Sequence, residues 1–142
     1  PIVYACMNMA KTKTGALIVI RQEMSLESYE KSGDIIDADI NSRLIENIFF
    51  KNSPLHDGAM IVDRGRICSA GCILPVSHDR NVPRALGLRH RSALGISQAT
   101  DAFAIVVSEE TGNISVAHKG VLHTRLSSTD LEHRLSQIMV ND

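Results

Sequence analysis

The sequence predicts a single α/β domain in which a central, twisted mixed β-sheet is flanked by helices. Continuous β-branched runs alternate with segments that carry apolar residues at helical spacing, which is typical of a sheet covered by helices. Several expected strands are separated only by tight turns, so part of the sheet must be antiparallel. The 142 residues match the length of one ordinary domain, and a hydrophobic content of 44% is enough to fill its core.

The first third of the chain contains one strong strand and one strong helix. Residues 2–10 combine apolar residues with good helix formers and predict a short helix. The run Ala-Leu-Ile-Val-Ile at 16–20 has no polar position, so we expect a strand that is buried on both faces and central in the sheet. A short helical turn is expected at 25–31. Apolar residues at helical spacing predict the clearest helix over residues 38–50.

The remaining sequence predicts hairpins, a polar loop and two more helices. Residues 59–62 and 67–74 should form a hairpin, because Asp63-Arg64-Gly65-Arg66 between them is a typical turn sequence. A polar loop is expected at 77–83. Further strands are expected at 102–107, 114–117 and 121–126, and helices at 92–99 and 131–139.

Charge, cysteine count and hydropathy narrow the class of protein. The net charge is −1 and no basic block is present, which argues against a nucleic-acid groove. Three cysteines without a Cys-x-x-Cys pair make a poor disulfide framework and favour a reducing, cytosolic setting. No apolar run approaches a membrane span, and no signal-peptide pattern is present. Because residue 1 is Pro and not Met, the chain could be a fragment whose anchor or further domains lie outside it.

The stretch Ser53-Pro-Leu-His-Asp-Gly-Ala59 is the first candidate for chemistry. Pro54 removes a backbone donor, and Gly58 relaxes the backbone and lets another molecule approach it. The Asp57 carboxylate at this position could hold a metal ion or accept a proton, with His56 as a second ligand or a proton relay. An Asp-Gly turn in which the carboxylate bonds its own backbone is the structural alternative.

Arg89-His90-Arg91 is the second candidate. These residues follow Gly87 at the expected start of a helix, where positive charge opposes the helix dipole and a bound anion would reverse that cost. Helix-start N–H groups together with guanidinium forks can form a phosphate site. Surface arginines paired with nearby carboxylates are the alternative.

Glu109 and Glu110 follow the expected strand at 102–107, and ligands tend to bind where the strands of α/β sheets end. One of these carboxylates could complete a metal site with Asp57, whereas an acidic hairpin turn is the structural interpretation. The chain has no Gly-x-Ser-x-Gly setting, no Walker A motif and no Gly-x-Gly-x-x-Gly. Any nucleotide site in this chain must therefore be built without these known phosphate-binding motifs.

Taken together, these motifs resemble the diadenylate cyclase (DAC) domain, whose signatures are Asp-Gly-Ala and Arg-His-Arg. The chain carries, in order, Pro54-Leu-His-Asp-Gly-Ala, Gly87-Leu-Arg-His-Arg and Val107-Ser-Glu-Glu-Thr-Gly. Gly15-Ala-Leu-Ile-Val-Ile and Cys72-Ile-Leu-Pro also sit where the family has similar segments. The likeness extends over residues 9–120 and is to the membrane-anchored bacterial branch of the family.

The resemblance implies an enzyme that joins two ATP molecules into cyclic di-AMP and releases two pyrophosphates. It implies a divalent metal, Mg²⁺ or Mn²⁺ and in some members Co²⁺. Each protomer would hold one ATP, and a homodimer would bring two sites face to face. Residues 1–142 would be the catalytic domain at the cytoplasmic face, joined to the membrane only through segments outside this chain.

The resemblance also implies roles for single residues. The catalytic residues would be Asp57, which holds the metal and helps activate the 3′-hydroxyl, and Arg89 and Arg91, which neutralise the triphosphate. Glu110 and His56 would support the metal. The family often has Thr just before Arg-His-Arg, where this chain has Leu88. The implied nucleotide-binding residues are Gly58, Ala59, Ile73, Leu74, Leu88, Arg89, His90, Arg91 and Ser108, with Ile73 and Leu74 beside the adenine.

Two other functions fit the same residues. Leu88 in place of a hydroxyl residue leaves open a regulatory module that binds an adenine nucleotide without turnover. A metal-dependent phosphohydrolase could use Asp57, Glu110 and His56, and it would release ADP or AMP. Pyrophosphate and a cyclic dinucleotide among the products would distinguish the cyclase from both.

Overall fold

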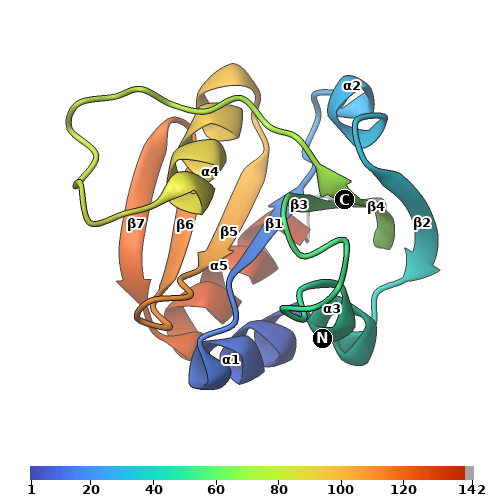
Figure 1. Ribbon diagram of the computed structural model, residues 1–142. Coiled ribbons are helices and arrows are strands. Elements are labelled where there is room, and N and C mark those ends of the chain that lie inside the picture. Colours follow the sequence, from blue (N-terminus) through green and yellow to red (C-terminus); the bar gives the residue numbers. More distant parts are fainter. Residues whose placement is uncertain (140–142) are drawn as a thin grey trace.

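Within residues 1–139, which this computed structural model describes, seven strands form one mixed sheet with helices on both faces (Figure 1). This arrangement confirms the expected α/β class and the mixed sheet. The helices are α1 (Ile2–Thr12), α2 (Glu27–Glu30), α3 (Ser42–Ile48), α4 (Leu88–Ala99) and α5 (Ser128–Met139). The strands are β1 (Ala16–Ile20), β2 (Asp34–Asp39), β3 (Ala59–Asp63), β4 (Arg66–Cys72), β5 (Phe103–Val107), β6 (Ile114–His118) and β7 (Val121–Leu126).

Strand β1 lies at the centre of the sheet, whose order is β2-β4-β3-β1-β5-β6-β7. It pairs in parallel with β3 and antiparallel with β5, and all five of its residues are buried. The expectation of a buried central strand at 16–20 is confirmed. The physical reason is that helices cover both faces here, so neither face of the strand can carry a polar side chain.

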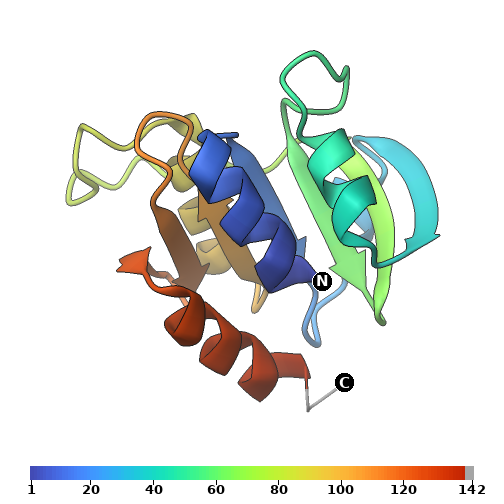
Figure 2. The ribbon, with the colours of Figure 1, turned by 90° about the horizontal axis from the view of Figure 1, so that it is seen from below.

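Two apolar cores separate the sheet from its helices. Helices α1, α3 and α5 pack on one face, where Met9, Phe49 and Leu131 are almost fully buried. Figure 2 shows these three helices on the same side of the sheet, with α4 behind it. The core on the other face joins α4 to the strands through residues such as Ile96 and Val106. The sheet is therefore the middle of three layers.

The expected helix at 38–50 is wrong at its N-terminal end. Residues Asp34–Asp39 form the edge strand β2, and the helix begins only after Asn41. The Asn41 side chain accepts hydrogen bonds from the backbone N–H groups of Arg43 and Leu44, which fixes the helix start there. Apolar residues just before a helix can match its spacing by chance, whereas the side-chain cap sets its true beginning.

Helix α4 starts at Leu88, four residues before the expected 92. Arg89, His90 and Arg91 therefore lie in its first turn, as the charge argument required. The second strand of the first hairpin is shorter than expected, because β4 ends at Cys72. Across residues 1–139, no helix has both the length and the apolar character that a bilayer span needs.

Candidate active site

A cleft of about 510 Å³ opens at one end of the central strands. Its walls come from five parts of the chain: Leu17 of β1, residues 57–58, residues 71–76, the start of α4 with the residues just before it, and residues 107–110 at the end of β5. Asp57 and Arg89, which are 32 positions apart in sequence, both line it. The two motifs that the sequence singled out thus meet in one site.

The register of the sheet explains why these segments meet. Ile18 of β1 pairs with Met60 of β3 in parallel, so the chain enters both strands at the same end of the sheet. Ala16 of β1 pairs with Val107 of antiparallel β5, so β5 leaves the sheet at that same end. Residues 57–58 before β3 and residues 108–110 after β5 therefore lie at the same end of the sheet, on either side of β1.

Arg89 is the central charge of the cleft. Its Nη2 lies 4.0 Å from Asp57 Oδ1, and its Nη1 lies 3.6 Å from Glu109 Oε1. The Arg89 side chain is 20% exposed, whereas that of Asp57 is 83% exposed. A largely buried cation is thus placed between two carboxylates that extend toward solvent. The sequence offered Glu109 or Glu110 as a metal ligand beside Asp57, whereas the pairing of Glu109 with Arg89 appears only in three dimensions.

His56 stands beside Asp57 but does not line the cleft. Its Nδ1 lies 2.7 Å from the Ser53 carbonyl oxygen, and its Nε2 lies 3.3 Å from Asp57 Oδ1. Because a carbonyl oxygen only accepts, Nδ1 must carry the proton of this hydrogen bond. Nε2 is then the ring nitrogen that faces the Asp57 carboxylate. This pair offers one nitrogen and one oxygen donor, a set that suits a divalent cation.

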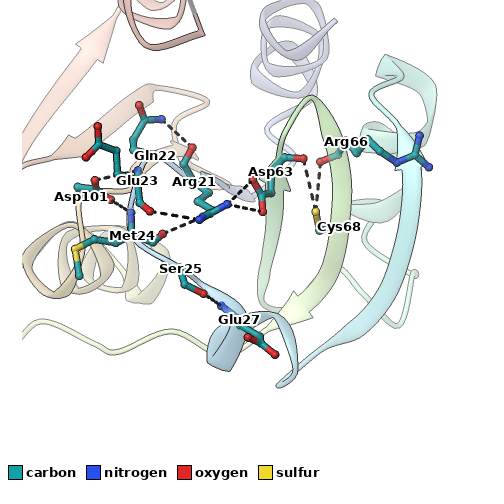
Figure 3. Close-up of polar contacts among 10 residues, drawn as sticks. All are labelled: Arg21, Gln22, Glu23, Met24, Ser25, Glu27, Asp63, Arg66, Cys68 and Asp101. Atoms are coloured by element: carbon teal, nitrogen blue, oxygen red, sulfur yellow. Dashed lines mark hydrogen bonds and ion pairs between the residues drawn. The ribbon is translucent and has the colours of Figure 1, made fainter. Parts of the chain in front are cut away.

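Another group of possible metal ligands lies outside the cleft. Among residues 1–139, the one set of three whose ligand atoms all lie within 4.8 Å is Glu30, Asp63 and Cys68, so Glu110 joins no such set. Asp63 already pairs with Arg21 at 3.2 Å (Figure 3). Burial and the charges of Glu30 and Asp63 raise the pKa of the Cys68 thiol to about 11, so it is protonated at neutral pH. These contacts favour a structural role for this set.

Arg91 points away from the cleft. Its Nη1 donates to the carbonyl oxygens of Ser77, at 3.4 Å, and Asp79, at 3.2 Å. The Ser77 backbone N–H in turn donates to the Arg91 carbonyl oxygen. The structure therefore brings Arg89, but not Arg91, together with Asp57. Arg91 ties the loop that precedes α4 to the helix.

His90 and Gly58 line the cleft, whereas Ala59 is fully buried behind it. Burial, and then the Arg89 charge, lower the pKa of His90, so this imidazole is neutral at pH 7. Gly58 has a φ of +117°, and a Cβ there would lie 2.8 Å from the Gly71 carbonyl carbon. The residue at 58 must therefore be glycine for the loop to lie against β4.

The opposite wall of the cleft is apolar. Ile73 and Leu88 are 72% and 68% exposed, and both line the cleft together with Leu74. Such exposed apolar surface beside a charged end suits a ligand with a flat apolar part and an anionic part. Ser108 also lines the cleft, and its Oγ accepts hydrogen bonds from the backbone N–H groups of Glu110 and Thr111. That hydroxyl shapes the turn after β5.

Comparison with known proteins gives consistent matches. The profile described as "DAC: DisA bacterial checkpoint controller nucleotide-binding" matches residues 3–122. Cyclic di-AMP synthase CdaA of Bacillus subtilis is 44% identical over 127 residues, which cover 89% of this chain and 46% of that protein. A diadenylate cyclase of Listeria monocytogenes is 44% identical over 132 residues, covering 93% of this chain and 48% of the relative. This chain thus spans about half the length of these two relatives.

Solved structures agree with the sequence matches. The crystal structure of a DacA double mutant from Staphylococcus aureus superposes with a TM-score of 0.95 at 42% identity, covering 96% of this chain and 91% of that chain. A hypothetical membrane spanning protein from Bacillus cereus superposes with a TM-score of 0.85 at 41% identity, covering 89% of this chain and 62% of that one. The two solved structures are therefore similar to this chain in sequence as well as in fold.

Proposed function

Because this chain belongs to the DAC family, we propose that it is the catalytic domain of a diadenylate cyclase. It would condense two ATP molecules into cyclic 3′,5′-di-AMP and release two pyrophosphates. The observation that carries the proposal is the position of Asp57 and Arg89, 4.0 Å apart in one cleft. The names of the Bacillus and Listeria relatives support the same activity.

The two ends of the cleft match the two ends of ATP. Ile73, Leu74 and Leu88 provide an apolar wall on which adenine can pack. Arg89 at the charged end would bind the triphosphate, because a guanidinium donates to phosphate oxygens through two parallel N–H groups. Its pairing with Asp57 and Glu109 is long enough, at 4.0 and 3.6 Å, for phosphate to compete successfully.

In the proposed reaction, the 3′-hydroxyl oxygen of one ATP attacks the α-phosphorus of the other. The bond from that phosphorus to the bridging oxygen breaks, and pyrophosphate leaves with the bonding electrons. The exposed Asp57 carboxylate would accept the hydroxyl proton. Arg89 would stabilise the charge that develops on the phosphoryl oxygens. A second round between the same nucleotides closes the ring.

The reaction needs two protomers if each cleft holds one ATP. Asp57 and the apolar side chains of Ile73 and Leu88 are exposed at the cleft, where a facing copy could bring its own nucleotide. A face-to-face homodimer would place each 3′-hydroxyl next to the partner's α-phosphorus. We therefore propose that an isolated monomer binds ATP but does not complete the ring.

A divalent ion would be held by Asp57 and His56, with Glu110 approaching from the turn after β5. Their oxygen and nitrogen donors suit Mg²⁺, Mn²⁺ or Co²⁺, which complete their coordination with substrate phosphates and water. When bound, such an ion supplies positive charge that neutralises the triphosphate and the departing pyrophosphate. His56 keeps its Nε2 available through the hydrogen bond of its Nδ1 to Ser53.

A regulatory module that binds an adenine nucleotide without turnover is the second candidate. Leu88 favours it, because this exposed apolar side chain occupies the cleft wall where many family members have a hydroxyl. Incubating the chain with ATP and Mg²⁺, Mn²⁺ or Co²⁺, and separating the products by chromatography, distinguishes the candidates. The cyclase predicts cyclic di-AMP and pyrophosphate in a ratio of one to two. ATP binding without turnover would support the regulatory module, and ADP or AMP would indicate a phosphohydrolase.

The longer protein would carry this domain at the cytoplasmic face of a membrane. The Bacillus cereus neighbour is described as membrane spanning, and the chain covers 62% of it. Separation of membrane and soluble fractions of cells that express the full-length protein tests this placement. Recovery of that protein only in the soluble fraction would contradict it.

A further inference from the structure

Gly15, the residue just before β1, lies directly behind the Arg89 side chain. A Cβ atom at this position would be 2.6 Å from Arg89 Cζ, 2.6 Å from Nη1 and 3.1 Å from Nη2. Since the central carbon is as close as the terminal nitrogen, the Cβ would point at the flat face of the guanidinium. The guanidinium thus rests on the glycine backbone, in space that any other residue would fill.

Few polar contacts fix the orientation of Arg89. Its Nε is buried and has no hydrogen-bond partner within the described residues. Its terminal nitrogens lie 3.6 Å from Glu109 Oε1 and 4.0 Å from Asp57 Oδ1, both longer than a good hydrogen bond. Packing against the main chain, and not a hydrogen-bond network, therefore holds the guanidinium in place.

We propose that Gly15 is a positioning residue for Arg89. By lacking a side chain it lets the guanidinium lie back against the start of β1, so that both terminal nitrogens face the cleft. This inference rests on the proposed role of Arg89 in binding phosphate. An alanine at position 15 would push the guanidinium forward by roughly 1 Å, to the normal separation of non-bonded carbon atoms. A displacement of that size is enough to weaken binding and slow catalysis.

The chain can accept alanine at this position without losing its fold. Gly15 does not adopt a left-handed φ, and the atoms that its Cβ would meet belong to the far end of a flexible side chain. Gly95 provides the contrast, because a Cβ there would lie 2.0 Å from the Pro75 backbone oxygen. Gly15→Ala therefore tests the orientation of Arg89 and not the stability of the sheet.

A double-mutant cycle provides the test. The probe is 3′-deoxy-ATP, which lacks the attacking hydroxyl and cannot be cyclised, and its Kd is measured by calorimetry with Mn²⁺. We expect Gly15→Ala to weaken binding about tenfold in the wild-type background. In the Arg89→Ala background the same change should have no further effect. Thr14→Ala is the matched control: the Thr14 hydroxyl shares a hydrogen bond with the Thr12 hydroxyl, and the variant should bind normally.

Each other result overturns a separate claim. An unchanged Kd for Gly15→Ala, or an equal loss in both backgrounds, would show that Gly15 does not act through Arg89. Unchanged binding by Arg89→Ala would refute the phosphate role of Arg89, and the Gly15 inference with it. Thermal unfolding of the variants is measured alongside. Gly15→Ala should melt within about 2 °C of the wild type, because the three nearest atoms that its Cβ would meet all belong to the movable end of the Arg89 side chain.

Discussion

Asp57 and Arg89 lie 4.0 Å apart in the cleft, and the proposed function rests on this pair. Arg89 is largely buried, and its Nε has no hydrogen-bond partner among residues 1–139, whereas Asp57 is 83% exposed. The cation is fixed while the carboxylate remains free to meet a ligand. At a protein surface a pair 4.0 Å apart would contribute little stability. Its position in a cleft with an apolar wall favours a role in binding.

The proton-accepting role of Asp57 is tested by Asp57→Asn. The amide keeps the size of the side chain but cannot accept the proton, so we expect cyclic di-AMP formation to fall by about 100-fold or more. The measurement is the chromatographic yield of cyclic di-AMP from ATP. Asp37→Asn alters an exposed carboxylate of the edge strand β2 that pairs with Arg66, far from the cleft residues in sequence, and should keep wild-type yield. Full yield from Asp57→Asn would remove Asp57 from the mechanism.

The sequence predicted the residues of the cleft better than their contacts. Asp57 and Arg89 were found because their motifs combine unusual residue types with chain breaks, and those signals are local. The contacts of Glu109 and Gly15 with Arg89 depend on the pairing of β1 with β5, which no local pattern reveals. Arg91 belonged to the same motif as Arg89. Because it lies two residues further along α4, its side chain leaves the helix in another direction and reaches the loop at 77–79.

The connection between α4 and the preceding loop depends on Arg91. Removing its side chain in Arg91→Ala deletes two hydrogen bonds from a charged donor to the carbonyls of Ser77 and Asp79. We expect a loss of about 1.5–3 kcal/mol in the free energy of unfolding, measured by urea denaturation. Arg80→Ala, in the same loop and exposed, should change this free energy by less than about 0.5 kcal/mol. Equal stability of the two variants would contradict the assigned role of Arg91.

The boundary between β2 and α3 is set by one side chain. Asn41→Ala removes the acceptor of the Arg43 and Leu44 N–H groups, and the loss of such a cap costs about 1 kcal/mol. The expected result is a lower urea midpoint with an unchanged m-value. Asn52→Ala, in the exposed turn after α3, serves as the control and should leave the midpoint unchanged. No difference between the two variants would mean that this cap does not define the helix start.

The irregular structure of β2 explains why this strand was not predicted from the sequence. Two adjacent isoleucines, Ile35 and Ile36, break the alternation of acidic and apolar residues that a strand would show. Asp37 has a φ of +49°, and the register with β4 shifts between Ile35 and Ala38. Arg66 of β4 pairs with Asp37 and Asp39 and holds this irregular edge in place. The partner that stabilises β2 lies 27 positions further along the chain, beyond the reach of any local pattern. The central strands β1 and β5 could be predicted from the sequence alone. All of their residues are buried, so each strand appears in the sequence as a continuous apolar run.

In the proposed reaction, which uses two nucleotides, the cleft of this chain would provide one of the two sites. If two protomers must meet, the rate of cyclic di-AMP formation per mole of protein should rise with protein concentration and level off once the dimer is fully formed. Serial dilution at saturating ATP, with the oligomeric state followed by analytical ultracentrifugation, measures this dependence. A constant specific rate in samples shown to be monomeric would rule out the face-to-face arrangement.

A crystal structure of this chain with 3′-deoxy-ATP and Mn²⁺ would show most directly whether the cleft binds the nucleotide. We expect electron density for the nucleotide in the cleft, with adenine against Ile73 and Leu88 and phosphates within hydrogen-bonding distance of Arg89. We also expect the ion beside the Asp57 carboxylate. Density for the nucleotide at any other surface, with the cleft empty, would contradict the account.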